Sequence, residues 1–387
     1  MTAPEQIPLA RPDLGAREQE LVLDVLRSGR LSLGPALDRF ERDFAAWLGV
    51  EDAVAVSSGT AGLHLGVRAL GWGAGDEVVT TPFSFVASSN CLLYEGVKPV
   101  FCDVDPVTLN LDPEAARAAV GAQTSGLLPA DILGYPAATP SLSEIASGAG
   151  LGLLQDACEA LGAVDSDGVR VGAQGFVATF AFYANKQLTT GEGGIVVPDG
   201  TASGERLRSE RNQGRAPDMG VVAHDRVGFN YRLTDLQAAI GIAQLERADD
   251  LLAGRARVAA AYTRRLGQSG AAPAGEGDPR GLVLPCSDRG SERRSWFVYA
   301  VQLPLGAERG AVVADLAQRG IQSKAYMPCI HLLGPYRERF GHREGEFPVA
   351  EDASDRLLAL PFFPGMSDGE VERVCEALDV ALRGDWT

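Results

Sequence analysis

The sequence lacks the cysteine spacings of a disulfide framework or a metal site. Its six cysteines stand singly, without a CxxC pair and without a Cys/His spacing typical of metal ligands. Disulfide-rich domains and zinc sites use closely spaced, paired cysteines. We therefore expect reduced thiols, no metal ion and a cytoplasmic location.

Basic charge and long apolar runs are also scarce. The 35 Lys and Arg residues are outnumbered by 51 Asp and Glu residues, and the formal net charge is −16. A field of this sign repels phosphate backbones and anionic lipid headgroups. The N-terminal residues MTAPEQIPLARPDLG have neither the basic start nor the apolar run of a signal peptide or membrane span. We therefore expect no nucleic-acid partner and no membrane insertion.

A glycine motif for dinucleotides is missing as well. No GxGxxG follows an expected strand, and GWGAGD at 71–76 has a different spacing. This absence argues against a hydride-transfer enzyme.

Short apolar runs alternate with helical patterns through the first half of the chain. At 387 residues, two domains are expected, because single cores rarely grow this large. The runs have the length of buried strands, which favours an α/β fold whose mainly parallel sheet is covered on both faces. The expected strands cover residues 53–56, 77–81, 99–104, 126–133, 151–157, 177–183 and 193–197, and helices are expected over 16–29, 36–48, 60–70 and 112–121.

The second half of the chain has fewer strand patterns. Residues 234–265 place apolar side chains at helical spacing and predict one long helix, whereas 295–303 predicts a strand. Helices are also expected near 308–319 and over 367–383. The predicted domains are a large α/β/α sheet domain with an N-terminal helical segment, 1–250, and a smaller α+β domain, 251–387.

The first candidate site follows the run at 53–56. Ligands of open α/β sheets bind beyond the carboxyl ends of the strands. The segment SSGTAGLHL predicts a helix that begins near Ser58, Gly59 and Thr60. The free N–H groups and hydroxyls at such a helix start can bind a phosphate. Ordinary helix capping by Ser or Thr is the alternative.

Asp156 and Lys186 follow two further apolar runs. Asp156 ends LGLLQD, where an ionised carboxylate needs a partner such as a protonated pyridine nitrogen. A helix cap is its alternative role.

Lys186 follows VATFAFYAN, and these apolar flanks favour a desolvated, reactive amine over the usual solvated position. A phosphate anchor, an acidic ring partner and an amine are the groups that pyridoxal phosphate requires. We therefore predict a pyridoxal-phosphate enzyme with Lys186 as the Schiff-base lysine.

Over nearly its whole length, the sequence resembles the sugar aminotransferases of the DegT and StrS type, which are fold-type I pyridoxal-phosphate enzymes. The segments that carry the resemblance include IPLARPDLG, SSGTAGLHL, GDEVVTTPFSFVAS, FYANKQLTTGEGG, GFNYRLTDLQAAIGIAQL, MPCIHLLGPYRERFG and FPVAEDASDRLLALPFFPGMSD. The resemblance implies transfer of an amino group from L-glutamate to a keto group of a nucleotide-linked deoxysugar. It also implies two ping-pong half-reactions linked by pyridoxamine phosphate.

The same resemblance implies roles for individual residues. It makes Asp156 the partner of the pyridine nitrogen and Phe85 the aromatic residue stacked on the cofactor ring. Ser58, Gly59 and Thr60 then hold the phosphate. Asn230 matches an asparagine that reaches the phosphate from the neighbouring subunit, which implies a homodimer with shared active sites.

Two positions depart from the family pattern. Ala181 stands where the family often has a phosphate-binding serine. Glu159 stands where Gln or His usually contacts the cofactor, and it can still hydrogen-bond the cofactor's ring oxygen if it is protonated. These departures bear on cofactor affinity rather than on cofactor identity.

Substrate residues are expected in two further segments. His331 matches a family histidine near the nucleotide-sugar site, and Tyr326 and Lys324 precede it in the same loop. Arg211 and Arg215 are candidates for the diphosphate or the donor carboxylate, although a packed histidine and mobile surface arginines are equally open interpretations. The PFSFVAS and TTGEGG segments favour a 4-keto-6-deoxy sugar and a product of the perosamine type.

Two alternatives keep the fold and change the function. A pyridoxal-phosphate-dependent sugar dehydratase has, by resemblance, histidine at the lysine position, and Lys186 argues against it. A non-catalytic regulator would have no use for an intact set of Lys186, Asp156 and Thr60, and no basic helix-turn-helix segment is present to contact DNA.

Overall fold

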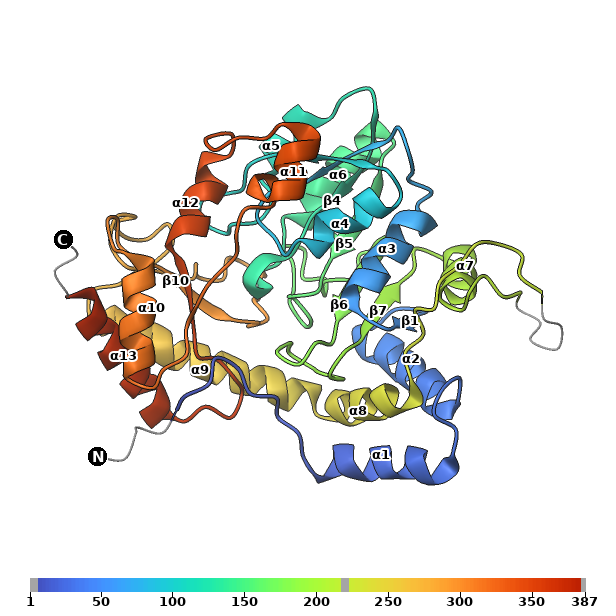
Figure 1. Ribbon diagram of the computed structural model, residues 1–387, viewed down its shortest axis with the longest axis horizontal. Helices are drawn as coiled ribbons and strands as arrows, with labels where there is room; N and C mark the ends of the chain where they lie inside the picture. The colour runs from blue at the N-terminus through green and yellow to red at the C-terminus, as the bar shows by residue number, and fades with distance from the viewer. Residues whose placement is uncertain (1–5, 217–222, 384–387) are drawn as a thin grey trace.

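The apolar runs of the first half pair into a twisted, mainly parallel sheet (Figure 1). In the computed structural model, which describes residues 6–216 and 223–383, this sheet has seven strands in the order β1-β7-β6-β5-β4-β2-β3. Neighbouring strands are parallel, except that β7 runs antiparallel to β1 and β6. The strands are β1 (Val54–Val56), β2 (Glu77–Thr80), β3 (Lys98–Phe101), β4 (Thr124–Leu128), β5 (Gly152–Asp156), β6 (Val177–Ala181) and β7 (Gly194–Val197).

Helices cover both faces of this sheet, as predicted. Alternation along β7 sends Ile195 and Val197 into one core with α2 and α8, and sends Val196 into another with α3. The helices of this half are α1 (Ala16–Ser28), α2 (Pro35–Leu48), α3 (Gly59–Ala69), α4 (Ala87–Tyr94), α5 (Pro113–Ala119), α6 (Thr139–Ala149), α7 (Thr201–Arg211) and α8 (Asp235–Glu246).

The prediction of one long helix over 234–265 is wrong in one respect, because this segment forms two helices. Between α8 and α9 (Ala248–Gln268), Arg247 leaves helical geometry with φ −127° and ψ 25°. Its guanidinium bonds to Asp13 and Glu18, which ties the break to the N-terminal segment. The predicted domain boundary between residues 250 and 251 falls inside α9 and stays a prediction.

A second, mostly antiparallel sheet follows α9. Among the described residues it has five strands in the order β11-β12-β10-β9-β8, of which only β10 had a counterpart in the sequence prediction. The strands are β8 (Ala272–Pro273), β9 (Val283–Leu284), β10 (Tyr299–Gln302), β11 (Lys324–Ala325) and β12 (Leu357–Leu360). The helices are α10 (Arg309–Gln318), α11 (Gly334–Phe340), α12 (Pro348–Arg356) and α13 (Asp368–Leu382), with 3₁₀ turns at Ile132–Gly134 and Ile330–Leu332.

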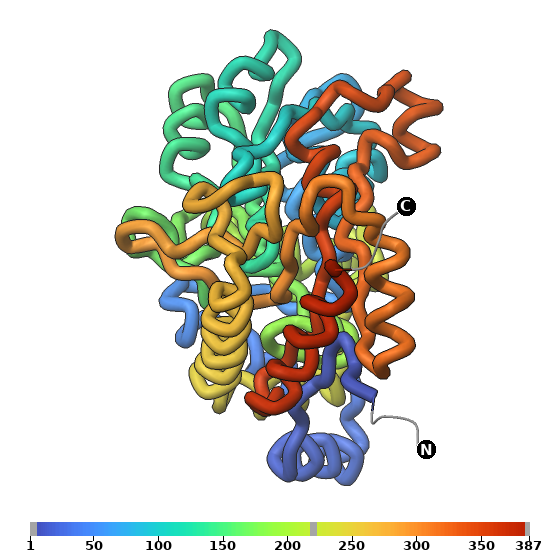
Figure 2. Tube along the Cα trace, turned by 90° about the vertical axis from the view of Figure 1, so that its left-hand side faces the viewer, coloured from blue at the N-terminus to red at the C-terminus, as the bar shows by residue number. Residues whose placement is uncertain are grey.

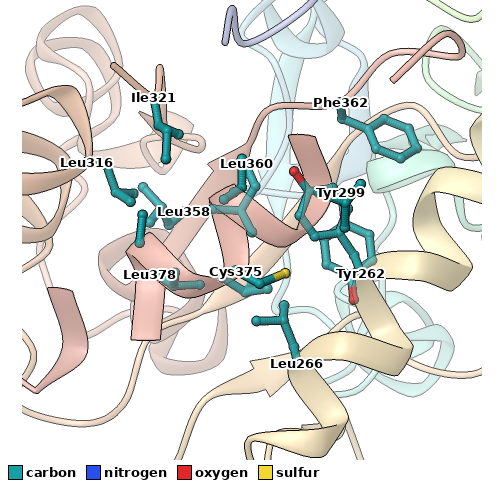
Figure 3. Close-up of a cluster of buried hydrophobic side chains, with 14 of the residues drawn as sticks. Tyr262, Leu266, Tyr299, Leu316, Ile321, Leu358, Leu360, Phe362, Cys375 and Leu378 are labelled. Atoms are coloured by element: carbon teal, nitrogen blue, oxygen red, sulfur yellow. The ribbon is translucent and has the colours of Figure 1, made fainter. Parts of the chain in front are cut away.

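The second sheet has its own core, formed with α9, α10 and α13. Figure 3 shows Tyr262 of α9 beside Tyr299 of β10, and their stacked ring centroids are 4.8 Å apart. Leu358, Leu360 and Cys375 close the same cluster. Figure 2 shows α10 and α13 side by side over this sheet. Within residues 6–216 and 223–383, no helix has the length and apolar content needed to cross a bilayer.

Candidate active site

A cavity of about 510 Å³ lies beyond the carboxyl ends of β1, β5 and β6, where the parallel sheet predicts a ligand site. Its wall combines residues of the large sheet with residues of the second sheet. Lys324 and Tyr326 come from β11 and the loop after it, and Phe297 precedes β10.

The start of α3 forms one end of the cavity. The Ser58 hydroxyl accepts a hydrogen bond from the Ala61 N–H at 3.1 Å, so the capping interpretation is correct for this side chain. The N–H groups of Gly59 and Thr60 have no acceptor inside the helix and remain available to an anion. A Cβ on Gly59 would lie 2.7 Å from the Ala181 Cβ, so glycine permits the close approach of α3 to β6. This backbone cradle fits a phosphate group.

Asp156 ends β5 on the cavity wall and is 7% exposed. Its Oδ2 accepts a hydrogen bond from the Ser88 hydroxyl at 2.6 Å, and its Oδ1 accepts one from the Cys158 N–H at 3.1 Å. Ser84 bonds Ser88 in turn at 2.6 Å. No Lys or Arg in the described part of the chain pairs with this carboxylate, so a protonated ring nitrogen would supply the missing positive charge. Ser88 was not predicted from the sequence, because its contact with Asp156 depends on how α4 packs against β5.

Lys186 is a cavity residue rather than a solvated surface lysine, since its side chain is only 13% exposed. Its Nζ lies 3.8 Å from Oε1 of Glu159 and 4.0 Å from the centroid of the Phe297 ring. Phe297 was not predicted from the sequence, because it lies 111 positions beyond Lys186 and is brought near only by the packing of the two sheets.

Glu159 connects the lysine to the wall of the second sheet. It accepts hydrogen bonds from the Leu133 N–H at 2.9 Å and from the Tyr326 hydroxyl at 3.1 Å. Burial raises the pKa of Glu159, while the charge of Lys186 opposes the rise. Burial, followed by the nearby Glu159 charge, raises the pKa of Tyr326 well above its ordinary value, so Tyr326 remains a hydrogen-bond donor.

Aromatic side chains stand at the mouth of the cavity. Phe85, predicted to stack on the cofactor ring, lines the wall and is 63% exposed. Tyr183, which the sequence did not single out, lines the same wall and is half exposed. Exposed rings beside a cavity offer flat apolar surface to a planar ligand.

Two predicted substrate residues do not reach this cavity. His331 is fully buried, with Nε2 3.1 Å from Oε1 of Glu351, and burial lowers the pKa of His331. Arg211 is buried as well, and its guanidinium donates to Glu41 and to the Ala55 carbonyl. Both are packed side chains that do not line this cavity, and their role as substrate contacts stays a prediction.

Two further candidates lie outside the cavity. Asn230 is exposed, and its backbone bridges to Asn212. Arg215 is not on the wall and bridges through its backbone to His224. In contrast, Lys324 and Tyr326 do line the cavity, as expected.

The architecture defines the class of protein. A mostly parallel sheet carrying a partly buried lysine and a buried carboxylate beyond its strand ends is the arrangement of fold-type I transferases. The chain belongs to the DegT/DnrJ/EryC1/StrS aminotransferase family, whose sequence profile matches residues 12–379. It is therefore a transferase of amino groups, as the sequence resemblance implied.

Individual relatives cover nearly the whole chain. The GDP-perosamine synthase of Caulobacter vibrioides is 34% identical over 97% of this chain and 98% of its own. The spore coat polysaccharide biosynthesis protein SpsC of Bacillus subtilis is 33% identical over 98% and 97%. The crystal structure of S. venezuelae DesV in complex with a ketimine intermediate has a TM-score of 0.89 and 33% identity, covering 98% and 100% of the two chains.

Proposed function

We propose that this aminotransferase moves an amino group from L-glutamate to the keto carbon of a nucleotide-linked deoxysugar, with pyridoxal phosphate as cofactor. The observation that carries the proposal is the common location of Lys186, Asp156 and the start of α3 on one cavity wall. An amine, a carboxylate and a phosphate cradle are the three contacts that pyridoxal phosphate requires of a protein.

Each group has a distinct task toward the cofactor. The N–H groups of Gly59 and Thr60 would bind the phosphate, and Asp156 would keep the ring nitrogen protonated. Phe85 offers its ring as a stacking surface, and Glu159 offers a carboxyl group for the ring oxygen. When bound, pyridoxal phosphate supplies the electron sink that makes removal of a Cα proton feasible and carries the amino group between half-reactions as pyridoxamine phosphate.

Lys186 has two roles in this proposal. Its Nζ is the amine that holds the cofactor covalently before a donor arrives. The same amine, once free, would accept and return the proton that leaves the donor Cα. The 13% exposure of the side chain keeps bulk water away from that transfer. The reverse sequence on the keto sugar completes a ping-pong cycle.

For the acceptor, we propose a 4-keto-6-deoxy sugar. The similarity to a GDP-perosamine synthase over 97% of the chain supports this choice. Lys324 and Tyr326 line the same cavity from the second sheet, where a cation and a hydroxyl can contact the nucleotide diphosphate or the sugar.

We further propose a homodimer in which each subunit completes the site of the other. Asn230 is exposed outside its own cavity, as a residue that serves a neighbour must be. Leucines on and after α1 add support, because they present apolar surface that a second copy would bury. Their exposed fractions are Leu23 46%, Leu26 51%, Leu31 45% and Leu33 42%.

The decisive experiment is the visible spectrum of the purified protein with pyridoxal phosphate, before and after addition of L-glutamate without a sugar. We expect a visible absorption band that glutamate removes with release of 2-oxoglutarate. The Lys186→Ala variant should keep the fold and lose turnover. A band that ignores glutamate would refute the donor, and a colourless protein would favour the regulatory alternative.

A further inference from the structure

Arg255 lies behind the Lys186 loop and is one of the most deeply buried cations in the described chain. The residue is 3% exposed and belongs to α9, which Figure 1 shows running from α8 toward α13. Its guanidinium donates four hydrogen bonds, all to backbone carbonyls. The acceptors are Asn185 at 3.3 Å, Lys186 at 2.9 Å, Trp296 at 3.4 Å and Phe297 at 3.0 Å.

This cation has no acidic partner among the residues that the structure describes. Burial alone lowers the pKa of Arg255 to about 10, and no carboxylate offsets that effect. A guanidinium with this pKa is still charged at neutral pH. Burying an unpaired cation costs several kcal/mol, roughly, and four carbonyl dipoles return only part of that energy. A neutral side chain would avoid this cost, so we expect Arg255 to do more than fill space in the core.

The four carbonyls belong to two segments that are distant in sequence and meet at the cavity. One guanidinium nitrogen holds the backbone of Lys186 itself. The other holds the backbone of Phe297, whose ring lies 4.0 Å from the Lys186 Nζ. The backbones of Lys186 and Phe297 are therefore held by the same planar guanidinium group. A guanidinium can bridge both segments because its donors form a rigid fork, which an ammonium lacks.

We propose that Arg255 is a positioning residue for Lys186, and that its fork clamps the lysine loop to the Phe297 segment so that the amine points into the cavity. The cofactor part of this inference rests on the proposed function. The clamp also couples α9 and the second sheet to the lysine, so the walls that carry Lys324 and Tyr326 move together with the reacting amine.

A general contribution to stability would explain the same burial of Arg255. The test therefore needs a control variant at a second buried arginine that does not contact the lysine loop. Arg294 is also buried, at 8% exposed, and its guanidinium contacts the Leu133 carbonyl, Cys286 and two aromatic rings. It touches neither Lys186 nor Phe297. The substitutions R255K and R294K remove comparable buried forks, and only the first removes the clamp.

The first test needs no cofactor. Backbone hydrogen exchange, followed by mass spectrometry of peptides spanning 182–190, should increase about tenfold or more in R255K and stay at the wild-type rate in R294K. Should R255K fail to fold, R255Q retains a planar amide with two donors and serves as the second variant. Equal exchange in wild type and both variants at position 255 would overturn the clamp.

The second test follows capture of pyridoxal phosphate by absorbance. We expect the rate constant for appearance of the visible band to fall about tenfold or more in R255K, because a displaced amine attacks less often. The visible circular dichroism per bound cofactor should fall as well, while R294K lowers only the melting temperature. Wild-type capture and dichroism in R255K would overturn the positioning role. If the wild type takes up no cofactor, the proposed function fails, whereas the exchange measurement still decides the clamp.

Discussion

Ala181 occupies the tightest point between the phosphate cradle and the lysine loop. Its Cβ lies 2.7 Å from the place that a Cβ on Gly59 would take, at the start of α3. A serine here would add a hydroxyl beside the free N–H groups of Gly59 and Thr60. If this cradle binds the cofactor's phosphate as proposed, it does so with one hydroxyl fewer than the family pattern provides.

The substitution Ala181→Ser should tighten cofactor binding. One additional hydrogen bond to a phosphate is worth about 1 kcal/mol, or about three- to tenfold in Kd. Absorbance titration with pyridoxal phosphate measures this change. Ala325→Ser is the control, because Ala325 also lines the cavity but belongs to β11 of the second sheet. An unchanged Kd in both variants would place the phosphate elsewhere.

Sequence reasoning succeeded for residues whose position follows from a strand end. Asp156 and Lys186 terminate or follow buried strands, and the parallel sheet brings them to one cavity. It did not reveal that the Arg211 and His331 side chains are buried in the fold, because residue type and segment do not fix the direction of a side chain. Glu41 and Glu351 bind these two side chains inside the fold.

At the scale of elements, a side chain from α8 caps the start of α2. Oδ1 of Asp235 accepts a hydrogen bond from the Gly34 N–H at 2.7 Å, and its Oδ2 accepts one from the Ala36 N–H at 2.9 Å. The carboxylate is 1% exposed and also faces the positive end of the α2 dipole. The two helices that flank one face of the sheet are thereby joined.

Asp235→Asn should lower the free energy of unfolding by about 1–3 kcal/mol. The amide retains one acceptor oxygen, so one of the two N–H groups meets another donor. Urea denaturation measures the loss. The matched control is Asp368→Asn in the first turn of α13, where the side chain is 80% exposed and the expected change is within about 0.5 kcal/mol. Equal losses in both variants would contradict the capping role.

Elements with strong local signals were predictable and those without them were not. The seven strands of the large sheet follow apolar runs, and all seven were expected within a few residues. The strand β12 was missed because LLAL follows directly after α12 with no turn signal. The break at Arg247 was missed because its cause, bonding to Asp13 and Glu18, lies more than 200 residues away.

At the scale of the whole molecule, Asp131 makes stability depend on pH. The carboxyl group is 1% exposed, and its Oδ2 has no partner among the described residues. Burial raises the pKa of Asp131 to about 8. The folded state therefore holds a proton that the unfolded chain has released from about pH 4 upward.

The sign of the effect follows from that proton. Stability should be full below about pH 4 as far as Asp131 is concerned and should fall as pH rises through about 8. Asp131→Asn mimics the protonated form and should flatten this dependence, with a relative gain on the order of 1–3 kcal/mol at pH 9. Denaturation of the cofactor-free protein from pH 5 to 9 measures both profiles. Parallel profiles would show that Asp131 is ionised throughout.

The proposed dimer predicts complementation between inactive subunits. Lys186→Ala removes the amine of its own site, and Asn230→Ala removes a contact from the partner's site. After mixed refolding, half of the dimers should contain one complete site, so activity should recover to about a quarter of the wild-type value. Each variant refolded alone is the control. No recovery would confine both residues to one subunit.

By itself, the sequence determined the α/β class and predicted that Lys186 and Asp156 follow or end buried strands on one side of the sheet. These follow from local hydrophobic patterns and from residues at strand ends, which depend on near neighbours. Only the tertiary structure decided the Phe297 ring beneath the amine, the Ser88 bond to Asp156 and the Arg255 clamp. These contacts join segments about 70 to 110 residues apart, and packing rather than spacing brings them together.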